Sequence, residues 1–307
     1  MQKRDLISIK DLLVEEIEHI FGLTDKLKEN PKNIGMPLTG KSMGMIFQKP
    51  SNRTRVSFEV GMTQLGGHAI YLGPDTIKLG EREKTSDIAK TLERYLDVIV
   101  ARVFKHDDII ELAKHSSIPV INGLSDMSHP CQALADLYTI KEKTGGFKGV
   151  KLAFVGDGNN VVHSLLYACA KVGLDLSVAT PKMYEPNKVV LQEALGFAKK
   201  SKAKINLSND PKEAVSGADF VYTDVWASMG QEKETAKRKK IFKDFALNEK
   251  LVSHAKKGCK IMHCLPAHRG EEITDAVIDS LNSIVFDEAE NRLHVQKAVL
   301  LWLLIER

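Results

Sequence analysis

Apolar residues along this chain fall into short runs and helical stripes that alternate from one end to the other. Between the short runs, helical spacing predicts helices, including 12–29, 186–200, 235–247 and 275–281. Strands that alternate with helices are typical of α/β proteins with parallel sheets. The runs of strand length are 42–47, 68–72, 97–103, 118–122, 151–155, 174–180, 204–208, 219–225, 260–266 and 283–288.

A strong helix stop divides the chain near its middle. The helix predicted from about 129 to 143 ends at Thr144-Gly145-Gly146, and glycine accepts the left-handed conformation that ends helices. We therefore expect two doubly wound parallel-sheet domains, residues 1–146 and 147–289. The last helix, 290–307, has no strand after it, and we expect it to pack back on the first domain. Ligands of open α/β sheets bind beyond the carboxyl ends of the strands, so we expect the active site in the cleft between the domains.

Composition excludes several classes of protein. Hydrophobic residues make up 43% of the chain and charged residues 27%, as in a soluble globular protein. Lys and Arg number 44 against 40 Asp and Glu, and this mild excess does not indicate a nucleic-acid partner. The most basic run, 233–243, is interpreted as a solvated helix face.

No segment has the pattern of a secretory signal or a membrane span. The N-terminus, MQKRDLISIKDLL, carries charges where a signal would need an apolar core, and the longest apolar run, 298–305, is far too short to cross a bilayer. The four cysteines include no CxxC pair, which favours free thiols in a reducing compartment. We therefore expect a cytoplasmic protein with no membrane partner.

The stretch KPSNRTRVSFE places two arginines at the start of a predicted helix. Ser51 is a natural N-cap for this helix. A helix N-terminus offers unpaired backbone N–H groups and a positive dipole end. Arg53 and Arg55, beside the hydroxyls of Ser51 and Thr54, therefore form a candidate phosphate site. The alternative is a capped helix with two solvated arginines.

The stretch FVGDGNNVV has the glycine turn of a dinucleotide-binding site, which makes a nicotinamide-dependent oxidoreductase one alternative function. Val161 stands where the third glycine of that fingerprint should be. The next strand ends in Ala179-Thr180-Pro181 instead of the acid that would hold a ribose. The turn instead places the amides of Asn159 and Asn160 at the end of the strand.

The stretch HCLPAHRG concentrates reactive groups after a predicted strand. A zinc site made by His263, Cys264 and His268 is conceivable, although the spacing differs from the usual pairs of zinc ligands. Cys264 could instead be a nucleophile, but the sequence identifies no base that would activate it.

Four motifs together are similar to those of one family. KPSNRTRVSFE resembles the carbamoyl-phosphate signature of the transcarbamylases, and HPCQALAD resembles the second segment of the same site. DVWASMG and HCLPAHRG are similar to the acceptor motifs of the ornithine-using members. The motifs occur in order over nearly the whole chain, which is identified as a member of the aspartate/ornithine carbamoyltransferase superfamily. The resemblance implies transfer of a carbamoyl group from carbamoyl phosphate to the δ-amine of L-ornithine, with no metal and no organic cofactor.

The resemblance also implies two sets of site residues. Arg102, His129 and Cys264 would be catalytic, with Cys264 orienting groups or relaying a proton. Residues expected to bind ornithine are Asn160, Asp224, Ser228 and Met229. Residues expected to bind carbamoyl phosphate are Ser51, Asn52, Arg53, Thr54, Arg102, His129, Gln132, Cys264, Leu265 and Arg292.

Two positions depart from the family pattern. Asn52 replaces the usual threonine, which removes one hydroxyl and leaves the backbone N–H. Lys78 stands where aspartate-using relatives have a lysine that reaches the neighbouring subunit, so a trans-subunit loop is one interpretation and an exposed lysine the other. The family implies a homotrimer or a multiple of trimers. Alternatives to ornithine as acceptor are aspartate, putrescine or an acylated ornithine, and a non-catalytic sensor is a further alternative.

Overall fold

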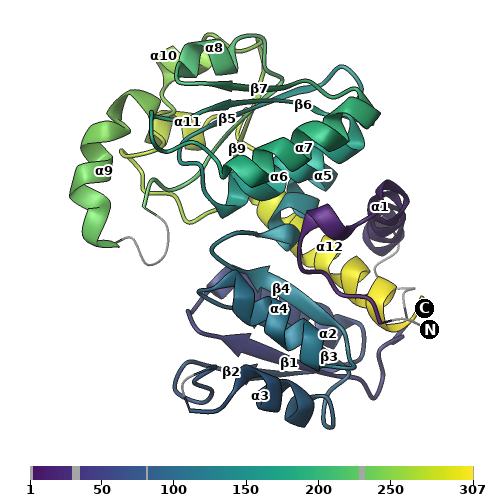
Figure 1. Ribbon diagram of the computed structural model, residues 1–307. Coiled ribbons are helices and arrows are strands. Elements are labelled where there is room, and N and C mark those ends of the chain that lie inside the picture. The colour runs from purple at the N-terminus through teal and green to yellow at the C-terminus, as the bar shows by residue number, and fades with distance from the viewer. Residues whose placement is uncertain (1–2, 30–34, 81, 228–231, 307) are drawn as a thin grey trace. The chain divides into compact units, whose positions relative to one another are not determined.

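The computed structural model describes residues 3–29, 35–80, 82–227 and 232–306. The chain forms two compact units, one comprising Met1–Ala135 with Glu290–Arg307 and the other Asp136–Ala289. Each unit contains one parallel sheet flanked by helices (Figure 1). This confirms the predicted α/β class with two doubly wound sheets. The division lies inside the helix α5 (Pro130–Thr144), whereas the sequence placed the boundary at the end of that helix.

The sheet of the first unit has four parallel strands in the order β2-β1-β3-β4. Its strands β1, β3 and β4 are almost entirely buried, as expected for parallel strands covered on both faces. The helix α12 begins in the second unit and continues into the first. The strands are β1 (Ser42–Phe47), β2 (His68–Leu72), β3 (Val98–Arg102) and β4 (Val120–Leu124). The helices are η1 (Ile9–Asp11), α1 (Val14–Glu29), α2 (Asn52–Gln64), α3 (Thr85–Leu92), α4 (His106–His115) and α12 (Val285–Leu304).

The sheet of the second unit has five parallel strands in the order β7-β6-β5-β8-β9. The strand order reverses between β5 and β8, and such switch points are where open α/β sheets bind ligands. Helices α6 and α7 cover one face of this sheet, and α8 and α10 the other (Figure 1). The strands are β5 (Lys151–Val155), β6 (Asp175–Ala179), β7 (Ile205–Ser208), β8 (Phe220–Thr223) and β9 (Lys260–His263). The helices are α6 (Asn160–Val172), α7 (Lys188–Ser201), α8 (Pro211–Val215), η2 (Glu232–Glu234), α9 (Thr235–Ile241), η3 (Lys243–Phe245), α10 (Glu249–Val252) and α11 (Asp275–Ile278).

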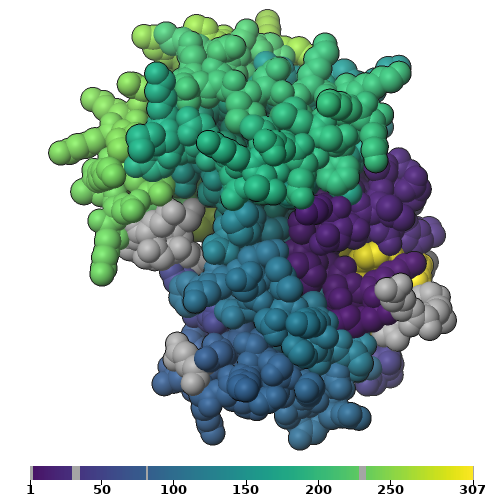
Figure 2. Space-filling view, viewed as in Figure 1, coloured from purple at the N-terminus to yellow at the C-terminus, as the bar shows by residue number. Residues whose placement is uncertain are grey.

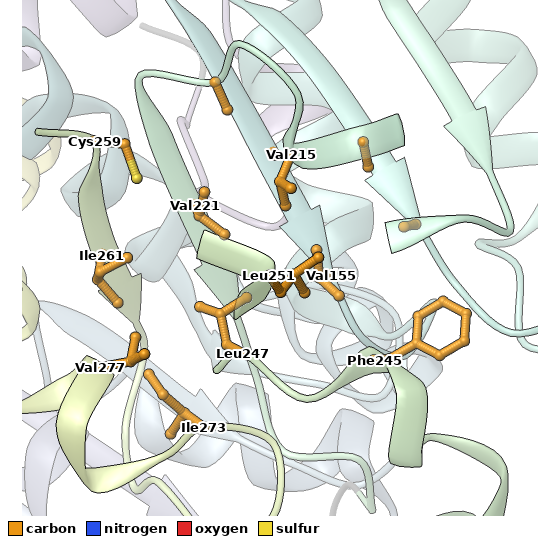
Figure 3. Packing of buried hydrophobic residues seen from close by; sticks show 14 of the residues in the cluster. Val155, Val215, Val221, Phe245, Leu247, Leu251, Cys259, Ile261, Ile273 and Val277 are labelled. Carbon is orange, nitrogen blue, oxygen red and sulfur yellow. The ribbon is translucent and has the colours of Figure 1, made fainter. Parts of the chain in front are cut away.

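A buried apolar cluster holds α8 and α10 on the sheet of the second unit (Figure 3). Val155, Val221 and Ile261 come from the neighbouring strands β5, β8 and β9, and they pack with Val215 of α8 and Leu251 of α10. Burying each such side chain stabilises the fold by roughly 1.5–3 kcal/mol. The cluster therefore fixes the three strands whose ends carry polar residues of the second unit.

The strand predicted at 283–288 is wrong. These residues lead into α12, which begins at Val285, and only Ser283 forms an isolated bridge, with Ile261. A short apolar run does not by itself distinguish a strand from the first turn of a buried helix. Among the described residues, no helix combines the length and the apolar character needed to cross a membrane.

Candidate functional site

Three neighbouring strands of the first unit end side by side. Phe47 of β1 is paired with Arg102 of β3, and Arg102 is paired with Leu124 of β4. The backbone N–H of Gln48 donates to the carbonyl of Arg102 at 2.9 Å, which ties the turn before α2 to the end of β3. The segments that follow β1 and β4 therefore begin on either side of Arg102.

Ser51 caps α2, as the sequence predicted. Its backbone is extended, and its hydroxyl accepts a hydrogen bond from the N–H of Thr54 at 3.4 Å. Thr54 is buried, Asn52 is exposed and Arg53 is half-buried. The first turn of α2 contains no acidic residue, so no carboxylate of that turn offsets the positive end of the helix dipole.

The structure separates the two arginines of this motif. Arg55 is exposed, its Nε donates to Glu59 at 3.3 Å, and its guanidinium lies 3.8 Å from the ring centroid of Tyr71. These contacts engage Arg55 away from the buried hydroxyl of Thr54. The structure therefore does not support the prediction that Arg55 serves the same anion site as Arg53.

Arg292 connects three helices that are far apart in the sequence. From α12 its Nη1 donates to Gln132 of α5 at 2.6 Å, and its Nη2 lies 3.5 Å from the hydroxyl of Thr54 in α2. Its Nε donates to Gln296 at 2.9 Å, and Gln296 donates to Ser57 of α2 at 2.7 Å. Gln296 and Ser57 were not predicted, because no motif marks residues that only orient another side chain.

His129 is the residue before α5, the helix that carries Gln132. It is buried, with 6% of its surface exposed. Burial is the main reason that the pKa of its imidazole lies well below the ordinary value. The positive charges of Arg292, Arg102 and Arg53 lower that pKa further. A neutral imidazole under the influence of three positive charges can donate a hydrogen bond to a bound anion or carbonyl without adding another charge.

The glycine turn of the second unit is filled by the chain itself. The N–H of Gly158 donates to the carbonyl of Tyr184 at 2.9 Å. A Cβ atom at Gly158 would lie 2.4 to 2.5 Å from backbone atoms of residues 184–186. The Asn159 side chain accepts from the N–H groups of Val161 and Val162 at 3.0 and 3.3 Å, so it caps α6. The close approach that glycine permits is therefore used for internal packing, which disfavours a pyrophosphate in this turn.

Asp224 lies directly after β8 and is buried. Its carboxylate accepts hydrogen bonds from the Asn159 amide at 2.7 Å and from the backbone N–H of Val225 at 2.8 Å. The thiol of Cys264, directly after β9, donates to the same carboxylate at 3.0 Å. Asn160 is buried at the start of α6. The structure thus brings Asp224 and Cys264 together, as expected for residues that follow neighbouring strands.

Cys264 is a neutral thiol in this environment. Burial, then the negative charge of Asp224 and the hydrogen bond to it, hold the pKa of the thiol well above its ordinary value. A cysteine nucleophile needs the opposite environment, because the thiolate is the reactive form. The geometry therefore favours an orienting role for Cys264 over covalent catalysis.

His263 and Glu272 hold the segment that carries Cys264 and Leu265. The imidazole Nδ1 of His263 accepts from the N–H of Leu265 at 2.8 Å, so Nε2 carries the proton and donates to Glu272 at 3.1 Å. Glu272 also accepts from the N–H of His268 at 2.5 Å. Leu265 is half-buried and has a φ of 57°, an unusual conformation for a non-glycine residue. The sequence did not predict Glu272, since nothing in it separates this acid from Glu271.

Two groups of donor atoms in the described parts of the chain could hold a metal ion. One consists of Asp224, His263 and Cys264, and the other of His268, Glu271 and Glu272, with all donor atoms of a group within 4.8 Å of one another. The predicted combination of His263, Cys264 and His268 is not among them. A metal in the first group would have to replace the Cys264 to Asp224 hydrogen bond and one bond of the His263 imidazole.

Three predicted residues, Lys78, Ser228 and Met229, remain to be placed. Lys78 is exposed in the loop that follows β2. Ser228 and Met229 lie outside the described residues.

Comparison with known proteins covers nearly the whole chain. The carbamoyl-P binding domain of the aspartate/ornithine carbamoyltransferase family matches residues 4–142, and the Asp/Orn binding domain of that family matches residues 148–303. The chain is similar to an ornithine carbamoyltransferase of Pyrococcus horikoshii, at 57% identity over 307 residues, which are 99% of this chain and 96% of that protein. It is 56% identical over 300 residues to an ornithine carbamoyltransferase of Pyrococcus furiosus described as anabolic, covering 97% of this chain and 95% of that protein.

Solved structures give the same result. An ornithine carbamoyltransferase structure from Pyrococcus furiosus matches with a TM-score of 0.96 and 54% identity, covering 99% of this chain and 97% of that one. A structure of an anabolic ornithine carbamoyltransferase from Campylobacter jejuni matches with a TM-score of 0.95 and 39% identity, covering all of both chains at 100%.

Proposed function

This chain belongs to the aspartate/ornithine carbamoyltransferase family, and we propose that it transfers the carbamoyl group of carbamoyl phosphate to the δ-amine of L-ornithine, giving L-citrulline and phosphate. The observation that carries the proposal is that Arg53, Arg102 and Arg292 all act electrostatically on the neutral His129, while Arg292 also contacts Thr54 in the capped first turn of α2. One relative is described as anabolic, and we assign this chain the same direction, citrulline formation in arginine biosynthesis.

The phosphate of carbamoyl phosphate is assigned to the start of α2. Ser51, Arg53 and Thr54 provide hydroxyls and a guanidinium beside the backbone N–H groups of the first turn. The N–H of Asn52 serves there as well, without the hydroxyl of the usual threonine. Arginine suits this task because its planar group binds phosphate oxygens in pairs.

The carbonyl group is assigned to the residues around His129. In the reaction the neutral δ-amine attacks the carbonyl carbon, a C–N bond forms, and a tetrahedral intermediate carries negative charge on the carbonyl oxygen. The bond to phosphate then breaks, phosphate leaves with the electron pair, and the nitrogen loses a proton. Arg102, His129 and Thr54 stabilise the charged oxygen, and Gln132 and Arg292 complete the contacts. No metal or organic cofactor is part of this proposal.

Ornithine is assigned to the second unit. The fixed charge of Asp224 pairs with the α-ammonium group, and Asn160, Ser228 and Met229 complete the contacts implied by the family. Cys264 and Leu265 lie near the reacting amine in this assignment. The hydrogen bond from the Cys264 thiol to Asp224 supports it, because it holds the carboxylate in one orientation.

A citrulline assay with a panel of acceptors tests the function. We expect the purified chain to form citrulline from carbamoyl phosphate and ornithine, and to use aspartate, putrescine and N-acetylornithine far more slowly. Arg53→Ala should lower kcat/KM by about a hundredfold or more, the usual effect of losing one donor to developing charge. Faster turnover of any other acceptor would reject the substrate assignment.

Arg55→Ala is the matched control for this experiment. Arg55 is two residues from Arg53 on the same helix, but its guanidinium contacts Glu59 and Tyr71 at the surface. Exposed ion pairs contribute little, so activity should stay within about twofold of the wild type. Equal losses in the two variants would contradict the assignment of the phosphate to Arg53.

The assembly and location of the chain are also proposals. We propose a homotrimer or a multiple of trimers, with Lys78 in a loop that reaches the neighbouring subunit. The first unit exposes apolar side chains that an interface could cover, namely Val56, Val60 and Ile70, which are 55%, 38% and 41% exposed. We assign the chain to the cytoplasm, because its four cysteines are free thiols, as expected in a reducing compartment. Cell fractionation that finds the chain elsewhere would contradict this location.

A further inference from the structure

Arg238 is a buried cation within the most basic segment of the chain. Only 6% of its surface is exposed, whereas Lys237, Lys239 and Lys240 on the same helix are exposed. Figure 2 shows this segment, in light green, with side chains extending from the surface. The interpretation of residues 233–243 as a solvated face is therefore wrong at Arg238. A buried guanidinium is costly unless its donors are satisfied, so its partners indicate what it does.

The partners of Arg238 come from two separate strand ends. Its Nη1 donates to the carboxylate of Asp157 at 2.8 Å and to the carbonyl of Trp226 at 2.8 Å. Its Nε donates to Glu234 at 3.0 Å, one turn earlier in the chain. The guanidinium carbon lies 5.0 Å from the ring centroid of Tyr184. One side chain thus joins the segment after β5 to the segment after β8.

These two segments carry the residues assigned to ornithine. Asp157 is three residues before Asn160, and Trp226 is two residues after Asp224. Because Arg238 bonds to both segments, it limits how far the amide of Asn160 and the carboxylate of Asp224 can move apart. The bond from Asn159 to Asp224 lies between the same two segments.

We propose that Arg238 is a positioning residue for the amino-acid acceptor, setting both the spacing and the net charge of the groups that meet the α-amino end of ornithine. This inference rests on the proposed function. The second unit holds two buried carboxylates at these strand ends, Asp157 and Asp224. The positive charge of Arg238 is paired with Asp157. The negative charge of Asp224 is therefore available to pair with the substrate ammonium.

The protonation of Asp157 supports the same conclusion. Burial, with a smaller contribution from the charge of Asp224, raises its pKa to about 6 against the lowering effects of Arg238 and of the Gly158 N–H. Glu234 shares Arg238 with Asp157, and Tyr184 faces the guanidinium. Without Arg238 the pKa of Asp157 would rise above about 6, so protonation of this carboxyl would extend toward neutral pH.

Steady-state kinetics of four variants tests the inference. We expect Arg238→Met to raise KM for ornithine about tenfold or more, and to move the acidic limb of the pH profile of kcat/KM for ornithine to higher pH. The dissociation constant of carbamoyl phosphate should stay within about twofold, because its proposed contacts are elsewhere. Arg238→Lys keeps the charge but not both bonds of Nη1, and should restore the pH profile more fully than KM.

The double variant Arg238→Met/Asp157→Asn separates positioning from stability. It removes both buried charges, so its thermal stability should recover relative to Arg238→Met, while KM for ornithine stays raised. Lys240→Met removes an exposed charge from the same helix and should match the wild type. If Arg238→Met does not fold, Arg238→Lys and the double variant provide the same comparison.

A folded Arg238 variant with a wild-type KM for ornithine and a wild-type pH profile would overturn the inference. The role of Arg238 would then be only to stabilise the fold through its ion pair. A wild-type chain that makes no citrulline from ornithine would instead reject the proposed function, and this inference with it. The two failures are distinguishable because the first appears only in the variants.

Discussion

At the scale of single residues, the interior of the second unit contains carboxyl groups that hold protons unusually tightly. Glu288 is fully buried, and the Tyr222 hydroxyl donates to it at 3.1 Å and the N–H of His263 at 3.0 Å. Burial, and then the charge of Asp136 and a hydrogen bond with it, raise the pKa of Glu288 well above its ordinary value near 4.5. The protonated carboxyl therefore stabilises the fold fully below pH 4.5, and this contribution is lost as pH rises through the raised pKa.

We expect the free energy of unfolding to fall toward alkaline pH, and to fall less steeply in Glu288→Gln, whose side chain does not ionise. Asp157 has a raised pKa of about 6 and contributes in the same direction. Urea unfolding at a series of pH values measures the slope directly. Glu290→Gln is the control, because Glu290 is exposed on the same helix. Equal slopes in wild type and Glu288→Gln would contradict the assignment of the proton to Glu288.

Some residues of the site could be predicted from the sequence, and others could not. Ser51 and Thr54 follow from the capping chemistry of one short stretch, and their contact is confirmed. The different surroundings of Arg53 and Arg55 depend on Tyr71, which belongs to a later strand. The sequence predicts Arg238 as a solvated cation, because nothing near it in the chain indicates its partner Asp157, which is 81 residues away.

At the scale of elements, the turn between β5 and α6 depends on one glycine. Gly158→Ala would place a Cβ atom 2.4 to 2.5 Å from the backbone of residues 184–186, and backbone cannot move aside cheaply. We expect a loss of stability of about 1–3 kcal/mol, as for other overpacked sites, measured by urea unfolding.

Gly196→Ala is the matched control for the turn. Gly196 lies inside α7, and a Cβ atom there would meet nothing within 4 Å. Alanine should stabilise this helix by about 0.5–1 kcal/mol, because glycine is the poorer helix former. If the two alanine variants changed stability in the same direction, the close packing of Gly158 would not be what determines the stability of its alanine variant.

Element prediction succeeded where the pattern was long and failed where it was short. The strands that build the two sheets and the helices between them follow from repeated apolar spacing over many residues. The run at 283–288 has the pattern of a strand, yet Val285 begins a helix whose later turns belong to the first unit. The short helices α8 and α10 were not predicted, because four or five residues are too few to show a period.

At the scale of the whole molecule, the assembly proposal makes a direct prediction of mass. Static light scattering should give three times the mass of one chain, or a multiple of three. Val56→Glu places a charge on the exposed apolar face of α2 and should shift the chain toward smaller species. Val189→Glu makes the same change at a 62% exposed position in the second unit and should not. A single-chain mass at micromolar concentration would refute the trimer.

The return of α12 to the first unit has a consequence for biosynthesis of the polypeptide. Arg292 contacts Thr54 and Gln132, so the cluster around His129 includes a residue that the ribosome adds after all of the second unit. Domains emerge from the ribosome in order, N-terminal first. A nascent chain that stops before α12 would therefore carry every strand of both sheets and still lack one of the three guanidiniums, so the anion site matures last.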